Sequence, residues 1–224
     1  MKYAKLENYF PIMKNNLFFG LENDDLKVVL SNTDYEVRDL QRGTYIFHEG
    51  DYIRKAGVVL EGELLVCKSY LDGQESVLDM LRPSKIFALD IALTKTGLSA
   101  FSVVAARMSK VILFSFNWDL FFSGLPLSVH KVMTENIIKY VSGENIRKQR
   151  KIEIISQNGL RQRIRTYLEF MRSKNGDQFS IPFSREQFAC FLCVNRSALS
   201  HELGLMRQEG LIDFKKNQFT LLKK

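Results

Sequence analysis

The sequence predicts an α+β fold in which a β-rich N-terminal part, a long helix and a small basic unit follow one another. Short segments rich in β-branched and aromatic residues alternate with turn signals between residues 35 and 116. Residues 125–156 then show apolar residues at helical spacing and contain one glycine. Residues 157–224 combine short amphipathic helices with a hairpin. We therefore divide the chain into domains at 1–124, 125–156 and 157–224.

Composition places the chain among globular proteins with an anionic partner. Its 224 residues are 46% hydrophobic and 25% charged, which excludes a disordered chain. The formal charge of +7 is unevenly spread. Residues 145–224 hold 16 Lys and Arg against 7 Asp and Glu, a charge of +9, and residues 1–144 hold 16 against 18, a charge of −2. This asymmetry favours two roles on one chain, with the anion bound by the C-terminal part.

Targeting signals and disulfides are not expected. Three cysteines are too few, and odd in number, for a disulfide framework. The first residues contain no continuous apolar segment of the kind that signal peptides carry. The most apolar stretch, residues 111–122, is too short to span a membrane. We expect a cytoplasmic protein.

The N-terminal part predicts an antiparallel sandwich or jelly roll. Residues 1–36 show helical spacing, with a helix start among the acids of residues 21–26. Strand-like segments follow at intervals of about ten residues, which is typical of this fold class. These segments are residues 44–47, 56–60, 64–67, 76–81, 101–105 and 110–116.

The long helix predicts a second subunit. A helix of about 30 residues spans roughly 45 Å, more than one small domain covers. Its apolar stripe needs a partner surface, most simply the same helix of a second copy. We assign this stripe to Val129, Met133, Ile137 and Tyr140. The alternative is a kinked helix packed on its own β-domain.

Residues 184–212 carry the most specific pattern in the chain. Ser184 and Gln187 form a capping box before a short helix whose apolar face comes from residues 188–192. A tight turn follows at residues 193–195, and Asn195 can cap a second helix. This is the helix-turn-helix layout, whose second helix enters the major groove of DNA, and the hairpin from 211 to 222 is its wing.

Polar residues on the outer face of the second helix are the expected DNA contacts. Arg196 can reach guanine O6 and N7 with two donors, and His201 can donate one hydrogen bond. The alternative for Arg196 is a surface salt bridge to Glu186 or Glu202. The expected base contacts are Arg196, Ser197, Ser200 and His201, and the expected phosphate contacts are Ser184, Arg185 and Asn195.

The whole chain resembles the bacterial cyclic-AMP receptor / fumarate-nitrate regulator family of transcription factors. The resemblance rests on the recognition-helix segment 195–203, NRSALSHEL, and on the turns at 47–51, 60–64 and 71–73. It implies a cyclic-nucleotide-binding-like jelly roll as effector sensor, a dimerisation helix and a winged helix-turn-helix. It also implies a homodimer on near-palindromic double-stranded DNA, with RNA polymerase as a partner if the protein is an activator.

The effector region departs from the family pattern. Members that bind cyclic AMP carry Gly-Glu-Leu and, further on, Arg-Ser or Arg-Thr before Ala. Without the arginine a buried phosphate loses its charge-assisted pair, so we expect an effector other than cyclic AMP and predict no cofactor. The alternative is a constitutive DNA-binding regulator with a ligand-free barrel. The corresponding residues here are Ala88, Leu89, Asp90, Leu98, Ser99 and Ala100.

Metal and enzyme chemistry are not expected. No cysteine precedes Cys67, which excludes the iron–sulfur cluster of one family branch. Cys190 and Cys193 lie inside the helix-turn-helix, and we interpret them as small buried thiols, although Cys193 replaces a glycine common at this turn. His48 and His130 are isolated in sequence and are interpreted as surface or packed residues. Three histidines are too few for a cupin-like metal enzyme, the remote alternative.

Overall fold

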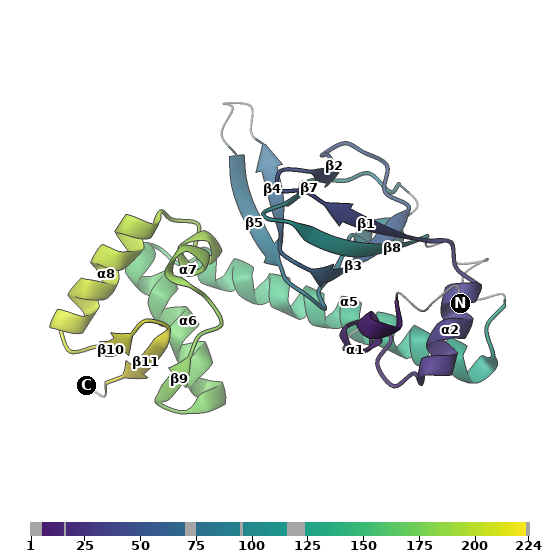
Figure 1. Cartoon of the computed structure of the whole chain (residues 1–224). Helices are drawn as coiled ribbons and strands as arrows, with labels where there is room; N and C mark the ends of the chain where they lie inside the picture. The colour runs from purple at the N-terminus through teal and green to yellow at the C-terminus, as the bar shows by residue number, and fades with distance from the viewer. Residues whose placement is uncertain (1–5, 16, 70–74, 95, 116–123, 223–224) are drawn as a thin grey trace. The chain divides into compact units, whose positions relative to one another are not determined.

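The computed structural model describes residues 6–15, 17–69, 75–94, 96–115 and 124–222. The chain consists of two compact units, Met1–Glu144 and Asn145–Lys224, and their boundary falls within helix α5, Leu127–Ile155. The α+β architecture with a β-rich N-terminal domain, a long helix and a C-terminal helix-turn-helix is confirmed (Figure 1). Within the described residues, no helix combines the length and apolar character needed to cross a membrane.

Two four-stranded antiparallel sheets form the N-terminal jelly roll (Figure 1). The first has the order β1 (Tyr35–Leu40), β8 (Ser109–Ser115), β3 (Lys55–Glu61), β6 (Ile86–Phe87). The second has the order β2 (Tyr45–Phe47), β7 (Ser102–Ala105), β4 (Leu64–Ser69), β5 (Glu75–Leu81). The short helix α3 (Leu89–Ala92) follows β6. The predicted turn at 71–73 lies outside the described residues.

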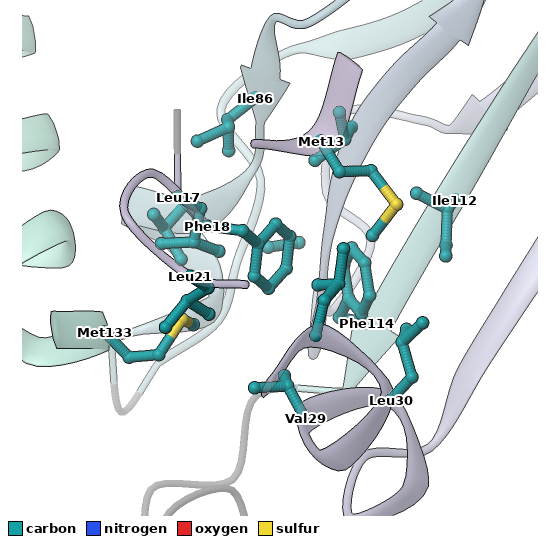
Figure 2. Close-up of a cluster of buried hydrophobic side chains, with 14 of the residues drawn as sticks. Met13, Leu17, Phe18, Leu21, Val29, Leu30, Ile86, Ile112, Phe114 and Met133 are labelled. Carbon is teal, nitrogen blue, oxygen red and sulfur yellow. The ribbon is translucent and has the colours of Figure 1, made fainter. Parts of the chain in front are cut away.

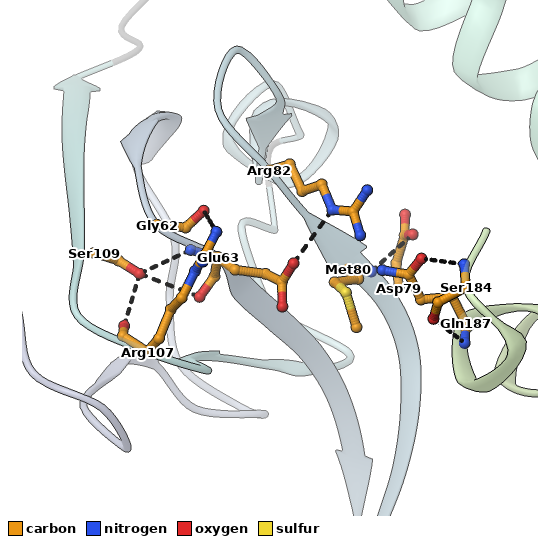
Figure 3. A network of polar contacts seen from close by, with 9 residues as sticks. All are labelled: Gly62, Glu63, Asp79, Met80, Arg82, Arg107, Ser109, Ser184 and Gln187. Atoms are coloured by element: carbon orange, nitrogen blue, oxygen red, sulfur yellow. Dashed lines mark hydrogen bonds and ion pairs between the residues drawn. The ribbon is translucent and has the colours of Figure 1, made fainter. Parts of the chain in front are cut away.

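The hairpin between β3 and β4 shows how sequence fixes one of these turns (Figure 3). Gly62 has φ +85°, and a Cβ there would overlap Ser109 Oγ. Ser109 Oγ accepts from Glu63 N at 3.0 Å, and Arg107 Nη2 donates to the Gly62 carbonyl at 3.3 Å. Arg82 Nε donates to Glu63 Oε2 at 3.2 Å. The turn therefore needs glycine both for its backbone angle and for space.

Strand β3 separates two apolar cores, which explains its continuous run of apolar residues. Val59 packs between the two sheets, whereas Val58 and Leu60 point to the outer face of the first sheet. The outer core is closed by the N-terminal helices η1 (Glu7–Tyr9), α1 (Phe10–Met13) and α2 (Asn23–Ser31) and by α5 (Figure 2). Asn136 of α5 donates to the carbonyls of Leu17 and Phe19 at 2.9 and 2.7 Å, which ties the N-terminal segment to the long helix.

The assignment of the apolar stripe on the long helix needs correction. Val129, Met133 and Ile137 are buried in the outer core of their own domain, and Tyr140 donates its hydroxyl to the Ile86 carbonyl at 3.1 Å. This face of α5 is covered by the N-terminal helices and the first sheet, as in the alternative considered above. The exposed apolar side chains of the helix are Leu127, Ile138, Val141, Ile146 and Ile152.

The C-terminal unit is a three-helix winged domain. After α5 come α6 (Leu160–Asn175), β9 (Gln178–Ser180), α7 (Arg185–Phe191), α8 (Arg196–Gln208), β10 (Ile212–Lys215) and β11 (Gln218–Leu221). The strands form one antiparallel sheet in the order β10-β11-β9. Its core joins Tyr167 of α6 to Phe183, Phe188 and Phe191, with ring centroids 4.9–5.9 Å from Tyr167. This burial raises the pKa of Tyr167.

Candidate nucleic-acid interface

Local hydrogen bonds begin both helices of the helix-turn-helix where the sequence predicts. Ser184 Oγ accepts from Gln187 N at 3.2 Å, and Gln187 Oε1 accepts from Ser184 N at 2.8 Å, forming the capping box of α7 (Figure 3). Asn195 Oδ1 accepts from Ala198 N at 2.8 Å and caps α8. Each cap satisfies a helix donor that would otherwise lack a partner.

Helix α8 is held on the domain by its inner face. Leu199, Leu203 and Met206 are buried in the core of the unit. Arg161 of α6 adds ion pairs to Glu202 at 2.5 Å and to Glu209 at 2.7 Å. The hydrogen bond to Glu209 and, with a smaller effect, the one to Glu202 raise the pKa of Arg161. The local sequence pattern did not predict these ion pairs, because Glu202 and Glu209 lie 41 and 48 residues from Arg161 and meet it only in the tertiary fold.

The outer face of α8 presents the residues expected to contact bases. Arg196, Ser197, Ser200 and His201 are all exposed. Arg196 Nη1 donates to Glu186 Oε1 of α7 at 2.9 Å, and its side chain remains 64% exposed. The salt bridge considered as the alternative is thus formed, but an exposed pair of this kind is worth about 1 kcal/mol or less and competes weakly with DNA. The hydroxyl of Ser197 donates to Asn195 Oδ1 at 2.8 Å.

Arg185 has a different environment from the one expected for a phosphate contact. Its Nη2 donates to the Lys216 carbonyl at 3.2 Å, and its guanidinium lies 5.0 Å from the Phe214 ring centroid. Burial, and then the charge of Arg196, lower the pKa of Arg185. The residue therefore joins the start of α7 to the wing. The exposed cations of the wing tip are Lys215 and Lys216, which sequence reasoning noted only as a turn.

The residues expected around an effector do not gather in one lining. Ala88 packs into the core between the sheets, and Leu89 packs into the outer core on the other side of the first sheet. Ser99 is buried, and its hydroxyl donates to the Phe101 carbonyl at 2.6 Å. The other three residues, Asp90, Leu98 and Ala100, are exposed.

Buried apolar side chains line the space between the sheets. Phe87 lies against Gly57 so closely that a Cβ at Gly57 would overlap its ring. Near the Ser99–Ala100 segment a cation comes from β4 instead of the expected position. Lys68 Nζ donates to the Ala100 carbonyl at 3.0 Å and pairs with Glu49. Sequence reasoning missed Lys68, because only the strand pairing of β4 with β7 places it beside residue 100.

Two family models match separate parts of this architecture. The cyclic nucleotide-binding domain matches residues 37–120, and the Crp-like helix-turn-helix domain matches residues 162–224. The chain belongs to the cyclic-AMP receptor / fumarate-nitrate regulator family. It is a transcription regulator with a cyclic nucleotide-binding domain and a DNA-binding helix-turn-helix.

One curated relative is similar in sequence, and two solved structures are similar in fold. The chain is 24% identical over 198 residues to the cyclic AMP receptor protein of Thermus thermophilus, covering 88% of this chain and 87% of the relative. Its fold is similar to that of the c-di-GMP responsive regulator CLP of Xanthomonas campestris, with TM-score 0.61, 14% identity and coverage of 91% and 100%. FixK2 of Bradyrhizobium japonicum has TM-score 0.57, 16% identity and coverage of 84% and 92%.

Proposed function

We propose that this regulator acts as a homodimer that reads a near-palindromic operator with the outer face of α8. The observation that carries the proposal is the exposed polar group Arg196, Ser197, Ser200 and His201 on a helix whose opposite face is buried. Two copies related by a twofold axis present two such helices, so half-sites should lie about 34 Å apart. Since its partner is chromosomal DNA, and RNA polymerase if it activates, we expect it in the cytoplasm.

Arg196 is the residue proposed to read a base. Its guanidinium lies on the first turn of α8, exposed and paired with Glu186. A bidentate arginine–guanine pair discriminates by about 1–3 kcal/mol. Ser200 and His201 extend the same face. Phosphate contacts are proposed for Ser184 and Asn195, and for Lys216 at the wing tip in place of Arg185.

A binding-site selection on the full chain tests this proposal. Arg196→Ala should weaken the selected site by about 1–3 kcal/mol and relax preference at one base pair. Arg165→Ala, which removes an exposed arginine of α6, is the matched control and should leave the consensus unchanged. Recovery of no consensus by the native chain contradicts sequence-specific binding, and an unchanged consensus with Arg196→Ala removes Arg196 as a base reader.

The dimer is proposed to form through the exposed side of α5. Ile138, Val141, Asn145 and Ile152 follow one another at steps of three, four and seven residues, which is the spacing of a coiled-coil seam. Ile138 and Ile152 are 60% and 59% exposed. An asparagine at such a position specifies register and oligomer state in two-stranded coils.

Light scattering at micromolar concentration tests the dimer. The native chain should be dimeric, and Ile138→Glu should give a monomer because a charge on the seam would be buried without a partner. Ile146→Glu is the matched control, since Ile146 is equally exposed but lies one residue off the seam. A monomeric native chain, or the same association state for both variants, would overturn this part of the proposal.

The effector is proposed to be a small molecule other than cyclic AMP. The names of two of the proteins compared above carry different nucleotides, and the carboxylate and arginine that would hold cyclic AMP are replaced here by Leu89 and Leu98. A second candidate, favoured by the packing of Phe87 on Gly57 between the sheets, is a constitutive regulator whose barrel holds no ligand. Thermal-shift measurements with cyclic nucleotides and small metabolites distinguish the two.

A further inference from the structure

Two cysteines occupy the turn between α7 and α8, and the proposed function makes no use of them. Val194 N donates to the Ala189 carbonyl at 3.0 Å, and Cys193 N donates to the Cys190 carbonyl at 3.1 Å. This pair of bonds, with Cys193 at φ +57°, is a Schellman motif that ends α7. A residue other than glycine is strained in this left-handed conformation, so Cys193 occupies a position that favours glycine.

The turn places the Cα atoms of Cys190 and Cys193 at a separation that disulfides can join. A four-residue turn closed by a hydrogen bond keeps its end Cα atoms less than about 7 Å apart, and disulfides join Cα atoms about 4.4–6.8 Å apart. Cys193 is exposed and Cys190 is half-buried. The interpretation of both as buried thiols was therefore wrong for Cys193. Cys67, by contrast, is 2% exposed in β4.

Metal binding is the other chemistry open to a C-x-x-C pair. Structural zinc sites are built almost always from four ligands. In the described parts of the chain, no group of three or more His, Cys, Asp or Glu is placed to hold a metal ion. Thiol–disulfide chemistry is therefore the chemistry that this pair of cysteines supports.

We propose that Cys190 and Cys193 form a redox-active dithiol whose oxidation to a disulfide weakens DNA binding. The oxidant is a low-molecular-weight disulfide. The Cys193 thiolate attacks one of its sulfurs, which forms a mixed disulfide and releases one small thiol. The Cys190 sulfur then attacks Cys193 Sγ, which forms the intramolecular bond and releases the second small thiol. Two protein thiols are oxidised, and one small disulfide is reduced to two thiols.

The position of the turn makes the Cys190–Cys193 disulfide easy to reduce and places it next to the start of α8. Strained or exposed disulfides are more easily reduced than buried structural ones, so this bond should respond to the thiol pool. Cys193 lies two residues before Asn195, the cap of α8. We expect closure of the ring to restrict the turn and shift the backbone that leads into this helix. The consequence for DNA rests on the proposed function, because it assumes that α8 reads the operator. We expect a loss of affinity of roughly tenfold, the scale of one base contact.

Oxidation of the full-length chain with glutathione disulfide tests the proposal by two independent measurements. Intact mass and peptide mapping should show loss of two hydrogens in the peptide that holds Cys190 and Cys193, reversed by dithiothreitol. Fluorescence anisotropy on the selected operator should show the drop in affinity and its recovery. Cys67→Ser should behave like the native chain. Cys193→Ser, checked for native circular dichroism, should bind DNA equally with and without oxidant, and Cys190→Ser should stop at the mixed disulfide, seen as the added mass of one glutathione on Cys193.

Several results would overturn the proposal. These are absence of the intramolecular disulfide at any oxidant concentration, a disulfide that leaves affinity unchanged, or equal loss of affinity in Cys193→Ser. A reduced native chain that binds no DNA contradicts the proposed function instead. In that case the mass measurement still decides whether the dithiol closes.

Discussion

Arg196 Nη1 donates to Glu186 Oε1 at 2.9 Å, so the guanidinium proposed to read a base is held by a carboxylate from the preceding helix. Both side chains are mostly exposed, at 64% and 72%. The carboxylate lies beside the surface proposed to face phosphates, where a negative charge would repel DNA of any sequence. We therefore expect Glu186 to oppose binding in two ways, by occupying Arg196 and by its own charge.

Glu186→Gln should raise DNA affinity. Removing the charge frees Arg196 and removes a repulsion, so we expect a gain of about 0.5–1 kcal/mol at low salt, decreasing as salt rises. Anisotropy titrations at two salt concentrations measure it. In combination with Arg196→Ala the gain should shrink, because part of it acts through the guanidinium. Weaker binding by Glu186→Gln would show that the ion pair with Glu186 holds Arg196 in the orientation that binds DNA.

Lys216→Ala should weaken binding to all sequences about equally. Lys216 at the wing tip is proposed to contact phosphate and not base edges, so its loss should reduce the slope of log affinity against log salt by about 1. Binding to operator and to random DNA over a salt series measures this. A selective loss on the operator alone would place Lys216 at a base.

Arg185→Ala should destabilise the C-terminal unit in the absence of DNA. The variant loses the bond to the Lys216 carbonyl and the packing of the guanidinium on Phe214 and Phe219. We expect a cost of about 1–2 kcal/mol, measured by urea unfolding. Arg165→Ala is the surface control and should change stability by less than about 0.5 kcal/mol. Equal stability of the two variants would show that the contacts of Arg185 with the wing do not stabilise the unit. Phosphate binding would then be the remaining role of Arg185.

Asn136→Ala should destabilise the N-terminal unit. The Asn136 side chain is 7% exposed and donates to two backbone carbonyls, those of Leu17 and Phe19. Its loss leaves two acceptors without their donor, at a cost of about 2–4 kcal/mol. Denaturant unfolding measures it, with the exposed Ser142→Ala on the same helix as control. A cost below about 1 kcal/mol would mean that the N-terminal segment is held by its apolar contacts alone.

Cys193→Gly should stabilise the C-terminal unit. Glycine adopts φ +57° without strain, and an exposed side chain loses little packing when it is removed. We expect a gain of about 1 kcal/mol under reducing conditions, seen as a rise in Tm. An unchanged or lower Tm would indicate that the thiol makes a contact worth more than the backbone strain.

Cyclic AMP should not stabilise the protein. A ligand that binds only the folded state raises Tm by an amount that grows with the logarithm of its concentration above Kd, and no arginine stands at Leu98 to pair with a cyclic phosphate. Thermal-shift and calorimetric titrations check this. Micromolar binding would mean that Lys68, beside the Ala100 carbonyl, supplies the missing charge.

What the sequence by itself determined was local. The capping box of Ser184 and Gln187, the Asn195 cap and the 3.6-residue spacing of Leu199, Leu203 and Met206 depend on residues three or four positions apart. They therefore predicted the helix-turn-helix and the exposed side of α8. The strand segments likewise predicted a jelly roll, because alternation and turn residues act over short distances.

The tertiary structure decided which apolar face was already covered and which charges met. The sequence spacing indicated an apolar stripe without a partner at Val129, Met133 and Ile137. In the structure, the N-terminal helices and the first sheet pack over these residues. The tertiary structure also placed Phe214 and Lys216 of the wing beside Arg185, a contact that the sequence did not indicate. Arg161 met Glu202 and Glu209 only when α6 lay against α8. Helical spacing tells which side of a helix is apolar, but burial and ion pairing depend on elements distant in sequence, whose positions are set by packing of the whole domain.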